Sequence, residues 1–330
     1  MPALAVLCAC GRYADFTLPI LRPAREITYK VSSVSRPLLI RGATGSWDSV
    51  DVLNPSVITW RDTYYNLYSG FDGHTWRTGV ATSSDGLVWS KGGMIVAPQS
   101  YPVAWDSSYI AANGSALAFH DKLFYWYQAG RPPRIGLAQS ANGFGWAKLV
   151  RPVLDTGPRG SFDERGAADP DVVSFGDFLY MYYLGQDRAH RQTIGVARSR
   201  DGVVWTKLRS NPVLEPGAPG QFDERGVGEP AVWAAFGWYW MLYTGRDHHE
   251  WRRIGLARSH DGVRWDKLGV IFAGTAAWNR QVVCDPSVIE ENGVVRVWYG
   301  GGDVPRPDEH IDGQIGLFTL TPQPVRGSAP

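Results

Sequence analysis

Residues 194–205, IGVARSRDGVVW, decide the fold, because close copies of this stretch recur along the chain. The copies GVATSSDGLVW, IGLAQSANGFGW and IGLARSHDGVRW end at Trp89, Trp146 and Trp265, and the quoted stretch ends at Trp205. The four tryptophans are therefore 57, 59 and 60 residues apart. Self-similarity at a nearly fixed period indicates one supersecondary unit repeated along the chain.

An aromatic run of alternating pattern precedes every copy, and it recurs once more near the end of the chain. The runs read YYNLYSG, LFYWYQAG, LYMYYLG, WYWMLYTG and VRVWYGG. Alternation of this kind predicts strands. With a short apolar strand before each run and an outer strand after each Asp-Gly turn, every unit predicts a four-stranded antiparallel blade. The sequence therefore predicts an all-β fold, a five-bladed β-propeller.

The fifth repeat stops after its third strand, IGLFTL, whereas ITYKVSSVSRPLL near the N-terminus is similar to the outer-strand stretch VVWTKLRSNPVL. We expect residues 27–31 to close the last blade, because a ring closed by both chain ends leaves no exposed sheet edge. Loss of residues 1–15 is expected to matter little. The expected organisation is one domain over 1–330, with an N-terminal extension at 1–25, a closing strand at 26–40, blade repeats at 47–320 and a tail at 321–330.

Composition excludes several classes of partner. The chain has 33 basic and 32 acidic residues and no basic cluster, which argues against nucleic-acid binding. No apolar run approaches the roughly 20 residues that span a bilayer, so no membrane segment is expected. The opening PALAVLCAC is only weakly similar to an export signal. A cytoplasmic location is therefore slightly favoured over export. Cys8, Cys10 and Cys284 are too few for a disulfide framework and are expected to be unpaired. Nothing in the sequence predicts the oligomeric state.

The repeat also assigns the recurring aspartates of the units to two faces. The Asp-Gly turns containing Asp85, Asp201 and Asp261 are expected on one face, where they serve the hairpins structurally. The loops before the first strand and between the second and third strands share the opposite face. On that face a set of aspartates, each following an aromatic residue, is expected to brace the loops: Asp48, Asp106, Asp163 and Asp223.

One residue per repeat heads the innermost strand beside the channel axis: Asn54, Asn113, Asp169, Glu229 and Asp285. Three adjacent repeats thus place a carboxyl group there, and glycoside hydrolysis needs two such groups, one protonated and one ionised. Clustered acids raise one another's pKa, which keeps one of them protonated near neutral pH. The alternative is that an acid before proline only begins a turn. Asp169, Glu229 and Asp285 are the candidate catalytic residues.

Further polar residues on this face are candidates for substrate binding. Asp171 follows Asp169 by two residues on one strand, so both side chains can point to the same side. Asp51 precedes Asn54 on the incoming loop. The complete set of candidate binding residues is Asp51, Asn54, Asn113, Asp171, Glu164, Arg165, Glu224, Arg225, Asp187, Arg188, Asp247, His248 and His249. Asp187 and Asp247 share a repeat position with Asp72 and Asp303, and this repetition favours a loop-bracing role over direct contact with a ligand, which stays the alternative.

The pattern of blades, Asp-Pro or Glu-Pro strand heads and Ser-x-Asp-Gly-x-x-Trp turns resembles the five-bladed glycosidase superfamily of β-fructosidases, arabinanases and mannoside phosphorylases, in glycoside hydrolase families 32, 43 and 130. In the first two families the acidic trio comes from the first three blades. Here Asn54 and Asn113 occupy the first two blades, and the acids follow in the third to fifth. The resemblance implies Asp169 as base or nucleophile, Glu229 as acid and Asp285 as orienting carboxylate.

These observations predict a glycosidase that cleaves a furanoside or related oligosaccharide by acid–base chemistry, with a carbohydrate as its partner and with no cofactor or metal. Three alternatives stay open. Rim arginines such as Arg131 and Arg246 could hold phosphate in a phosphorylase. Trp76 and Trp251 could stack on sugars in a propeller that binds without cleaving. Rim histidines could hold a metal ion with Asp285.

Overall fold

Strands form nearly all the regular structure of this computed structural model, which describes residues 12–101 and 103–325. Cys8, Cys10 and the signal-like start lie outside these residues. The alternating and aromatic-rich runs form the strands that they predict, and the fold is all-β. Within the described ranges, no helix is long and apolar enough to cross a membrane.

Successive repeats form successive groups of antiparallel strands. The first group contains β3 (Asp51–Trp60), β4 (Thr63–Phe71), β5 (Trp76–Ser83) and β6 (Ser90–Val96). The second contains β7 (Ile110–Phe119), β8 (Lys122–Ala129), β9 (Arg134–Ser140) and β10 (Ala147–Lys148). The third contains β11 (Gly166–Phe175), β12 (Phe178–Gln186), β13 (Gln192–Ser199) and β14 (Thr206–Leu208). The fourth contains β15 (Gly226–Ala235), β16 (Trp238–Arg246), β17 (Arg252–Ser259) and β18 (Asp266–Phe272). The last contains β19 (Val282–Glu291), β20 (Val294–Gly302) and β21 (Gln314–Pro324), and a short 3-10 turn, η2 (Ala277–Asn279), precedes it.

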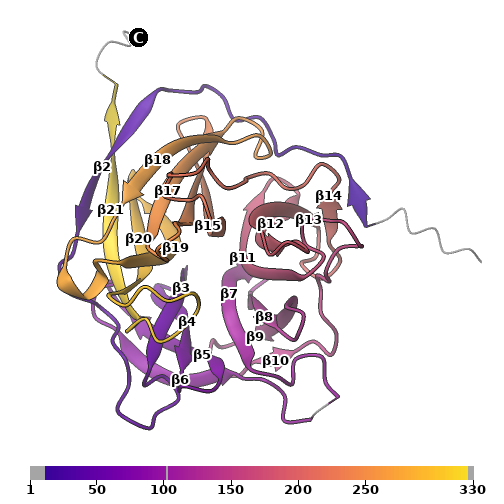
Figure 1. Ribbon diagram of the computed structural model, residues 1–330, viewed down its shortest axis with the longest axis vertical. Helices are drawn as coiled ribbons and strands as arrows, with labels where there is room; N and C mark the ends of the chain where they lie inside the picture. Colours follow the sequence, from indigo (N-terminus) through magenta and orange to yellow (C-terminus); the bar gives the residue numbers. More distant parts are fainter. Residues whose placement is uncertain (1–11, 102, 326–330) are drawn as a thin grey trace, which may run out of the picture.

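The first strand of each group lies next to the first strand of the following group, and β19 lies next to β3. Figure 1 shows β3, β7, β11, β15 and β19 around the centre of the molecule. One repeat position joins most of these neighbours, since its side chain accepts a hydrogen bond from a backbone N–H of the adjacent strand at 2.7 to 2.9 Å. The acceptors are Ser56, Ser115, Asp171 and Ser287.

The N-terminal segment supplies the strand that the last group lacks. β2 (Ile27–Ser33) pairs antiparallel with β21, from Ile27 opposite Pro324 to Ser33 opposite Phe318. This is the pairing that the sequence predicts for residues 27–31. Its apolar side chains pack on a core cluster that includes Trp240 and Leu320.

Residues 12–25 pack against the third and fourth strand groups, whereas the expectation that loss of residues 1–15 matters little stays a prediction. β1 (Tyr13–Ala14) pairs in parallel with β14 of the third group. The chain then crosses the fourth group, where the backbone N–H of Leu18 donates to the carbonyl of Asp261 at 2.8 Å and that of Arg25 donates to Phe236 at 2.9 Å. Figure 1 shows this indigo segment running along the outside from β14 to β2.

The predicted structural aspartates have the expected partners. In the turn after β5, Asp85 Oδ1 accepts hydrogen bonds from the backbone N–H groups of Leu87 and Val88. Asp201 and Asp261 do the same in their own turns. The brace aspartates each accept from a tyrosine hydroxyl of the second strand and a lysine of the outer strand: Asp48 from Tyr68 and Lys91, Asp106 from Tyr127 and Lys148, Asp163 from Tyr183 and Lys207, and Asp223 from Tyr243 and Lys267. Both sets therefore hold loops in place, as predicted.

Candidate active site

Every innermost strand carries the same irregularity close to its start. The pairing register shifts at one residue pair in each of β3, β7, β11, β15 and β19. The residue at the shift has a left-handed backbone, with φ between 43° and 52°. These residues are Asn54, Asn113, Asp169, Glu229 and Asp285. A left-handed conformation is uncommon for a residue other than glycine and is disfavoured before proline, and such strain concentrates at functional sites.

The five strand-head residues meet around one cavity. All of them line a cavity of about 250 Å³, and with the proline or glycine that follows each they also surround a narrower space of about 30 Å³. The wall from the first two groups is aromatic, with Trp76 and Tyr109. The wall from the third and fourth groups is polar, with Gln192, Arg246 and Arg252. A concave site with a few convergent polar groups is the usual form of a small-molecule binding site.

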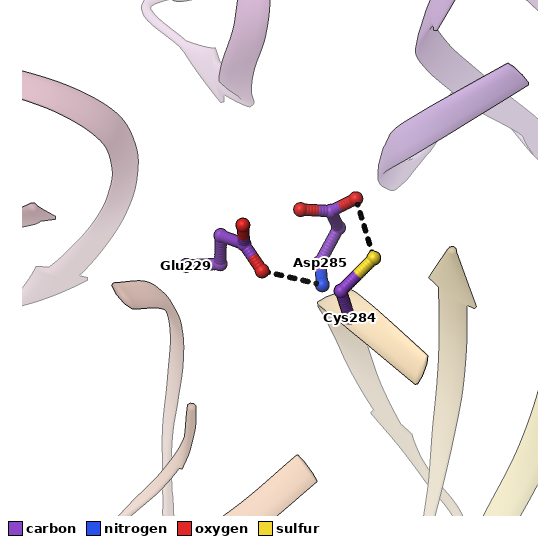
Figure 2. A group of neighbouring side chains, drawn as sticks. All are labelled: Glu229, Cys284 and Asp285. Carbon is purple, nitrogen blue, oxygen red and sulfur yellow. Dashed lines mark hydrogen bonds between the residues drawn. The ribbon is translucent and has the colours of Figure 1, made fainter. Parts of the chain in front are cut away.

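Two of the predicted catalytic residues are in direct contact, because the Glu229 carboxyl group accepts the backbone N–H of Asp285. The N–H of Asp285 donates to Glu229 Oε2 and to Thr244 Oγ1, each at 3.1 Å. Asp285 Oδ2 in turn accepts from the Cys284 thiol at 3.2 Å and from the backbone N–H of Asn54 at 3.3 Å. Figure 2 shows Glu229 and Asp285 side by side, with Cys284 against the Asp285 carboxylate.

The third carboxyl group, Asp169, is oriented by an amide. Asn113 Nδ2 donates to Asp169 Oδ1 at 3.2 Å, and Asn113 Oδ1 accepts from Ser69 Oγ at 3.0 Å. The two amides among the strand-head residues therefore both contact acids of this chain. Asn113 contacts one through its side chain, and Asn54 contacts the other through its backbone.

The surroundings of the acids favour their neutral forms. Burial, followed by the nearby Glu229, raises the pKa of Asp169 to about 8. Burial and the same Glu229 raise the pKa of Asp285 well above its usual value. Both causes destabilise the ionised carboxylate, because burial removes its hydration and Glu229 places a second negative charge beside it. The site therefore retains protons at neutral pH, as an acid catalyst requires.

Arg252, which the sequence analysis did not identify, lies beside this acidic cluster. It is only 7% exposed, and its Nη2 donates to the carbonyl of Arg306 at 3.0 Å. Burial alone would lower the pKa of Arg252, but Cys284, Glu229 and Asp285 raise it, so the guanidinium stays charged. A signal was present, because Arg252, Gln192 and Trp76 each stand three residues before the glycine of the third strand and all line the cavity.

Two predicted binding residues lie away from the cavity. Asp51 is fully buried, and its carboxylate accepts from the backbone N–H groups of His310 at 2.6 Å and Gly313 at 2.7 Å. Asp171 accepts from the N–H of Val232 at 2.8 Å. Asp171 was expected on the same side as Asp169, but the register shift between Ala168 and Asp171 breaks the alternation of side chains.

The acids among the predicted rim residues hold their own loops. Glu164 accepts from Gly160 N–H and Arg188, both at 2.7 Å, and Glu224 accepts from Gly220 N–H and His248 Nδ1, both at 2.6 Å. Asp187 pairs with Arg191, and Asp247 accepts from the N–H groups of His249 and Trp251. Arg165 and Arg225 are exposed and directly precede the cavity-lining Gly166 and Gly226. None of these predicted rim residues lines the cavity itself.

A metal ion would need a group of ligand atoms that lie close together. Among the residues that the structure describes, the only such group is Glu229, Cys284 and Asp285, whose ligand atoms lie within 4.8 Å of one another. The rim histidines are not part of it. Burial raises the pKa of the Cys284 thiol, which opposes the thiolate that a metal needs. The raised pKa of Asp285 opposes its ionised form in the same way.

Known structures share this architecture at low sequence identity. A family 32 β-fructofuranosidase of Bombyx mori is 16% identical, with a TM-score of 0.64 over 89% of this chain and 66% of that one. A thermostable family 43 glycoside hydrolase is 20% identical, with a TM-score of 0.62 over 88% and 97%. A structure from a study of family 130 mannoside phosphorylases and hydrolases of β-1,2 mannosidic linkages is 16% identical, with a TM-score of 0.67 over 96% and 99%.

The chain also has relatives in sequence. Two uncharacterized proteins of Mycobacterium tuberculosis, from strains CDC 1551 and H37Rv, are each 30% identical to the chain in an alignment of 234 residues. The alignment covers 64% of this chain and 75% of the relative. The model of the glycosyl hydrolases family 32 N-terminal domain matches residues 58–284. Because this match covers well over half of the sequence, the chain belongs to the family of the glycosyl hydrolases family 32 N-terminal domain and is a glycosidase.

Proposed function

We propose that the chain hydrolyses a furanoside or a related oligosaccharide in the central funnel of a single domain, a five-bladed propeller closed by β2. Five repeats in sequence, the succession of β3, β7, β11, β15 and β19 around the centre, and the contact of β19 with β3 support this architecture. The cavity lined by one residue of each repeat supports the position of the site.

The observation that carries the proposal is the carboxyl trio on one cavity, with the pKa of Asp169 raised to about 8. A protonated carboxyl group can donate its proton to the glycosidic oxygen while an ionised one attacks the sugar or activates water. We therefore assign the acid to Asp169, the reverse of the role that family resemblance implies.

Glu229 is the partner carboxylate in this assignment. It accepts the N–H of Asp285 and lies in the field of the Arg252 guanidinium, surroundings that suit an anionic nucleophile or base. Asp285 positions Glu229 through that N–H, and Asn113 positions Asp169. Asp169 donates its proton to the oxygen of the departing group. The water molecule that completes hydrolysis gives a proton back to Asp169.

The test replaces each carboxyl group by its amide. Activity of Asp169→Asn and Glu229→Gln on nitrophenyl furanosides and oligosaccharides is expected to fall by about 10²- to 10⁴-fold, the usual contribution of acid–base catalysis. Activity of the wild type should also fall above about pH 8, as Asp169 loses its proton.

The matched control is Asp177→Asn, which changes an exposed aspartate in the turn between β11 and β12. Its activity and melting temperature should equal those of the wild type. Full activity in both amide variants would contradict the assignment of the catalytic pair.

Phosphorolysis is the second candidate, because Arg246 and Arg252 both line the cavity and arginine is well suited to phosphate. Turnover that requires inorganic phosphate and releases a sugar phosphate would favour this reaction. Turnover that is independent of phosphate favours hydrolysis.

A further inference from the structure

The loop between β20 and β21 differs from the equivalent loops of the other repeats. It covers residues 303–313, whereas the equivalent loops cover only 72–75, 130–133, 187–191 and 247–251. Two of its residues, Pro307 and Asp308, line the cavity that the strand heads surround. The last repeat thus adds a segment to the site that the other repeats do not have.

Hydrogen bonds to three other repeats hold this loop in place. They join Arg252 to the Arg306 carbonyl, Tyr109 and Trp76 to the Glu309 carboxylate, and the N–H groups of His310 and Gly313 to the Asp51 carboxylate. The partners belong to the first, second and fourth repeats. A loop fixed at several points presents its side chains in a defined geometry, which a binding site needs.

Asp308 is an acid of this loop that these contacts leave free, and unlike Asp303 it lines the cavity. Glu309 and Asp51 are both occupied, whereas Asp308 makes no hydrogen bond or ion pair to any part of the chain within 12–101 and 103–325. It is exposed at the cavity wall, and its charge acts on both Asp169 and Arg252. A loop carboxylate that only braced the loop would have a partner within it, as Asp72 has in its own loop.

We propose that Asp308 is a specificity-determining residue that accepts hydrogen bonds from sugar hydroxyl groups at the cavity mouth. This inference rests on the proposed function and names the substrate class more closely. A carboxylate has two oxygens that can accept from neighbouring hydroxyls, and such charge-assisted bonds are strong. The same charge repels a carboxylate or phosphate on the substrate, so the site selects neutral glycosides.

The test compares Asp308→Asn with Asp303→Asn. Asp303 begins the same loop, is exposed and does not line the cavity, so it is the matched control. For Asp308→Asn we expect KM for a neutral nitrophenyl arabinofuranoside to rise about tenfold, as loss of a hydrogen bond to a charged group implies, with kcat nearly unchanged. The preference for this glycoside over its 5-phosphate should narrow, and the control should keep both values.

Two outcomes overturn the inference. One is an unchanged KM and an unchanged preference in Asp308→Asn. The other is a loss of kcat as large as that of Asp169→Asn, which would make Asp308 part of the catalytic machinery. Amide for carboxylate keeps the side-chain shape, and equal melting temperatures confirm that the loop is intact.

Binding measured by calorimetry with the same furanoside separates this inference from the proposed function. If the wild-type protein binds the glycoside without cleaving it, the proposed hydrolysis is contradicted, but the role of Asp308 is still tested. In that case Asp308→Asn should bind the glycoside about tenfold more weakly than the wild type. Equal affinity of the wild type and Asp308→Asn contradicts the role of Asp308 whether or not the protein is an active hydrolase.

Discussion

Different side chains perform the same structural role at one repeat position of this fold. The position that joins adjacent inner strands is serine in β3, β7 and β19 but aspartate in β11. All four accept one backbone N–H, so the carboxylate at Asp171 adds a charge to a task that a hydroxyl performs elsewhere. Burial raises the pKa of Asp171 to about 7, against an ordinary value near 3.8.

We predict that Asp171→Ser makes stability less dependent on pH. Between about pH 4 and 7 the folded state holds a proton that the unfolded state has lost, so wild-type stability falls as pH rises through this range. Serine does not titrate. The melting temperature of the variant, relative to the wild type, should therefore be higher at pH 8 than at pH 4.5.

The converse variant, Ser115→Asp, places a carboxyl group at the same position in β7 and should introduce the same fall of stability with pH. Parallel melting-temperature curves for Asp171→Ser and the wild type across this range would show that Asp171 does not carry the effect.

At the scale of elements, one brace recurs with different burial. Asp48 and Asp163 each accept from the tyrosine of the second strand and the lysine of the outer strand. The Lys91 side chain is 30% exposed, whereas that of Lys207 is 7% exposed, and burial lowers the pKa of Lys207 although Asp163 opposes this. Loss of the aspartate should therefore have different costs in the two groups.

We predict that Asp163→Ala lowers the free energy of unfolding by about 3 to 5 kcal/mol, the cost of leaving a buried charge without its partner. Asp48→Ala should cost clearly less, because Lys91 can turn its ammonium group to water. Chemical denaturation of both variants measures the difference, and the volume lost is the same in each. Equal losses would mean that burial of the lysine does not set the strength of the brace.

At the scale of the whole molecule, the N-terminal segment connects three strand groups. It pairs with β14, crosses the fourth group and pairs with β21 along seven residues. Tyr29 of β2 packs with ring centroids 5.1 Å from Trp240 and 6.1 Å from Trp233, so β2 joins the fourth group to the last. Its removal would expose an edge of β21 and part of a core cluster.

We predict that deletion of residues 1–33 lowers the melting temperature far more than deletion of residues 1–25, which keeps β2. Deletion of 1–25 should itself have a measurable effect, because it removes β1 and Leu18. Should the longer deletion fail to fold, Tyr29→Ala provides the test in the full chain, with an expected loss of about 3 kcal/mol. Equal melting temperatures of the two deletions would show that β2 is dispensable.

The sequence by itself determined the features that repeat. The strands, the Asp-Gly turns and the aspartate braces depend on contacts within one unit of about 60 residues. Their recurrence at a nearly fixed period makes them recognisable in the sequence. The pairing of residues 27–31 with β21 could also be predicted, because the last repeat visibly lacks a strand. The heads of the inner strands could be identified as a set for the same reason.

Only the tertiary structure decided which of these residues line the central cavity. The left-handed backbone at each strand head turns Asp169 into the cavity, and the same register shift directs Asp171 to Val232, which no alternating pattern predicts. Arg252 and Asp308 join the acids because distant repeats converge on one axis. The physical reason is that hydrogen bonds and periodicity within a unit are local, whereas the pKa of Asp169 depends on burial and on Glu229 from the next repeat.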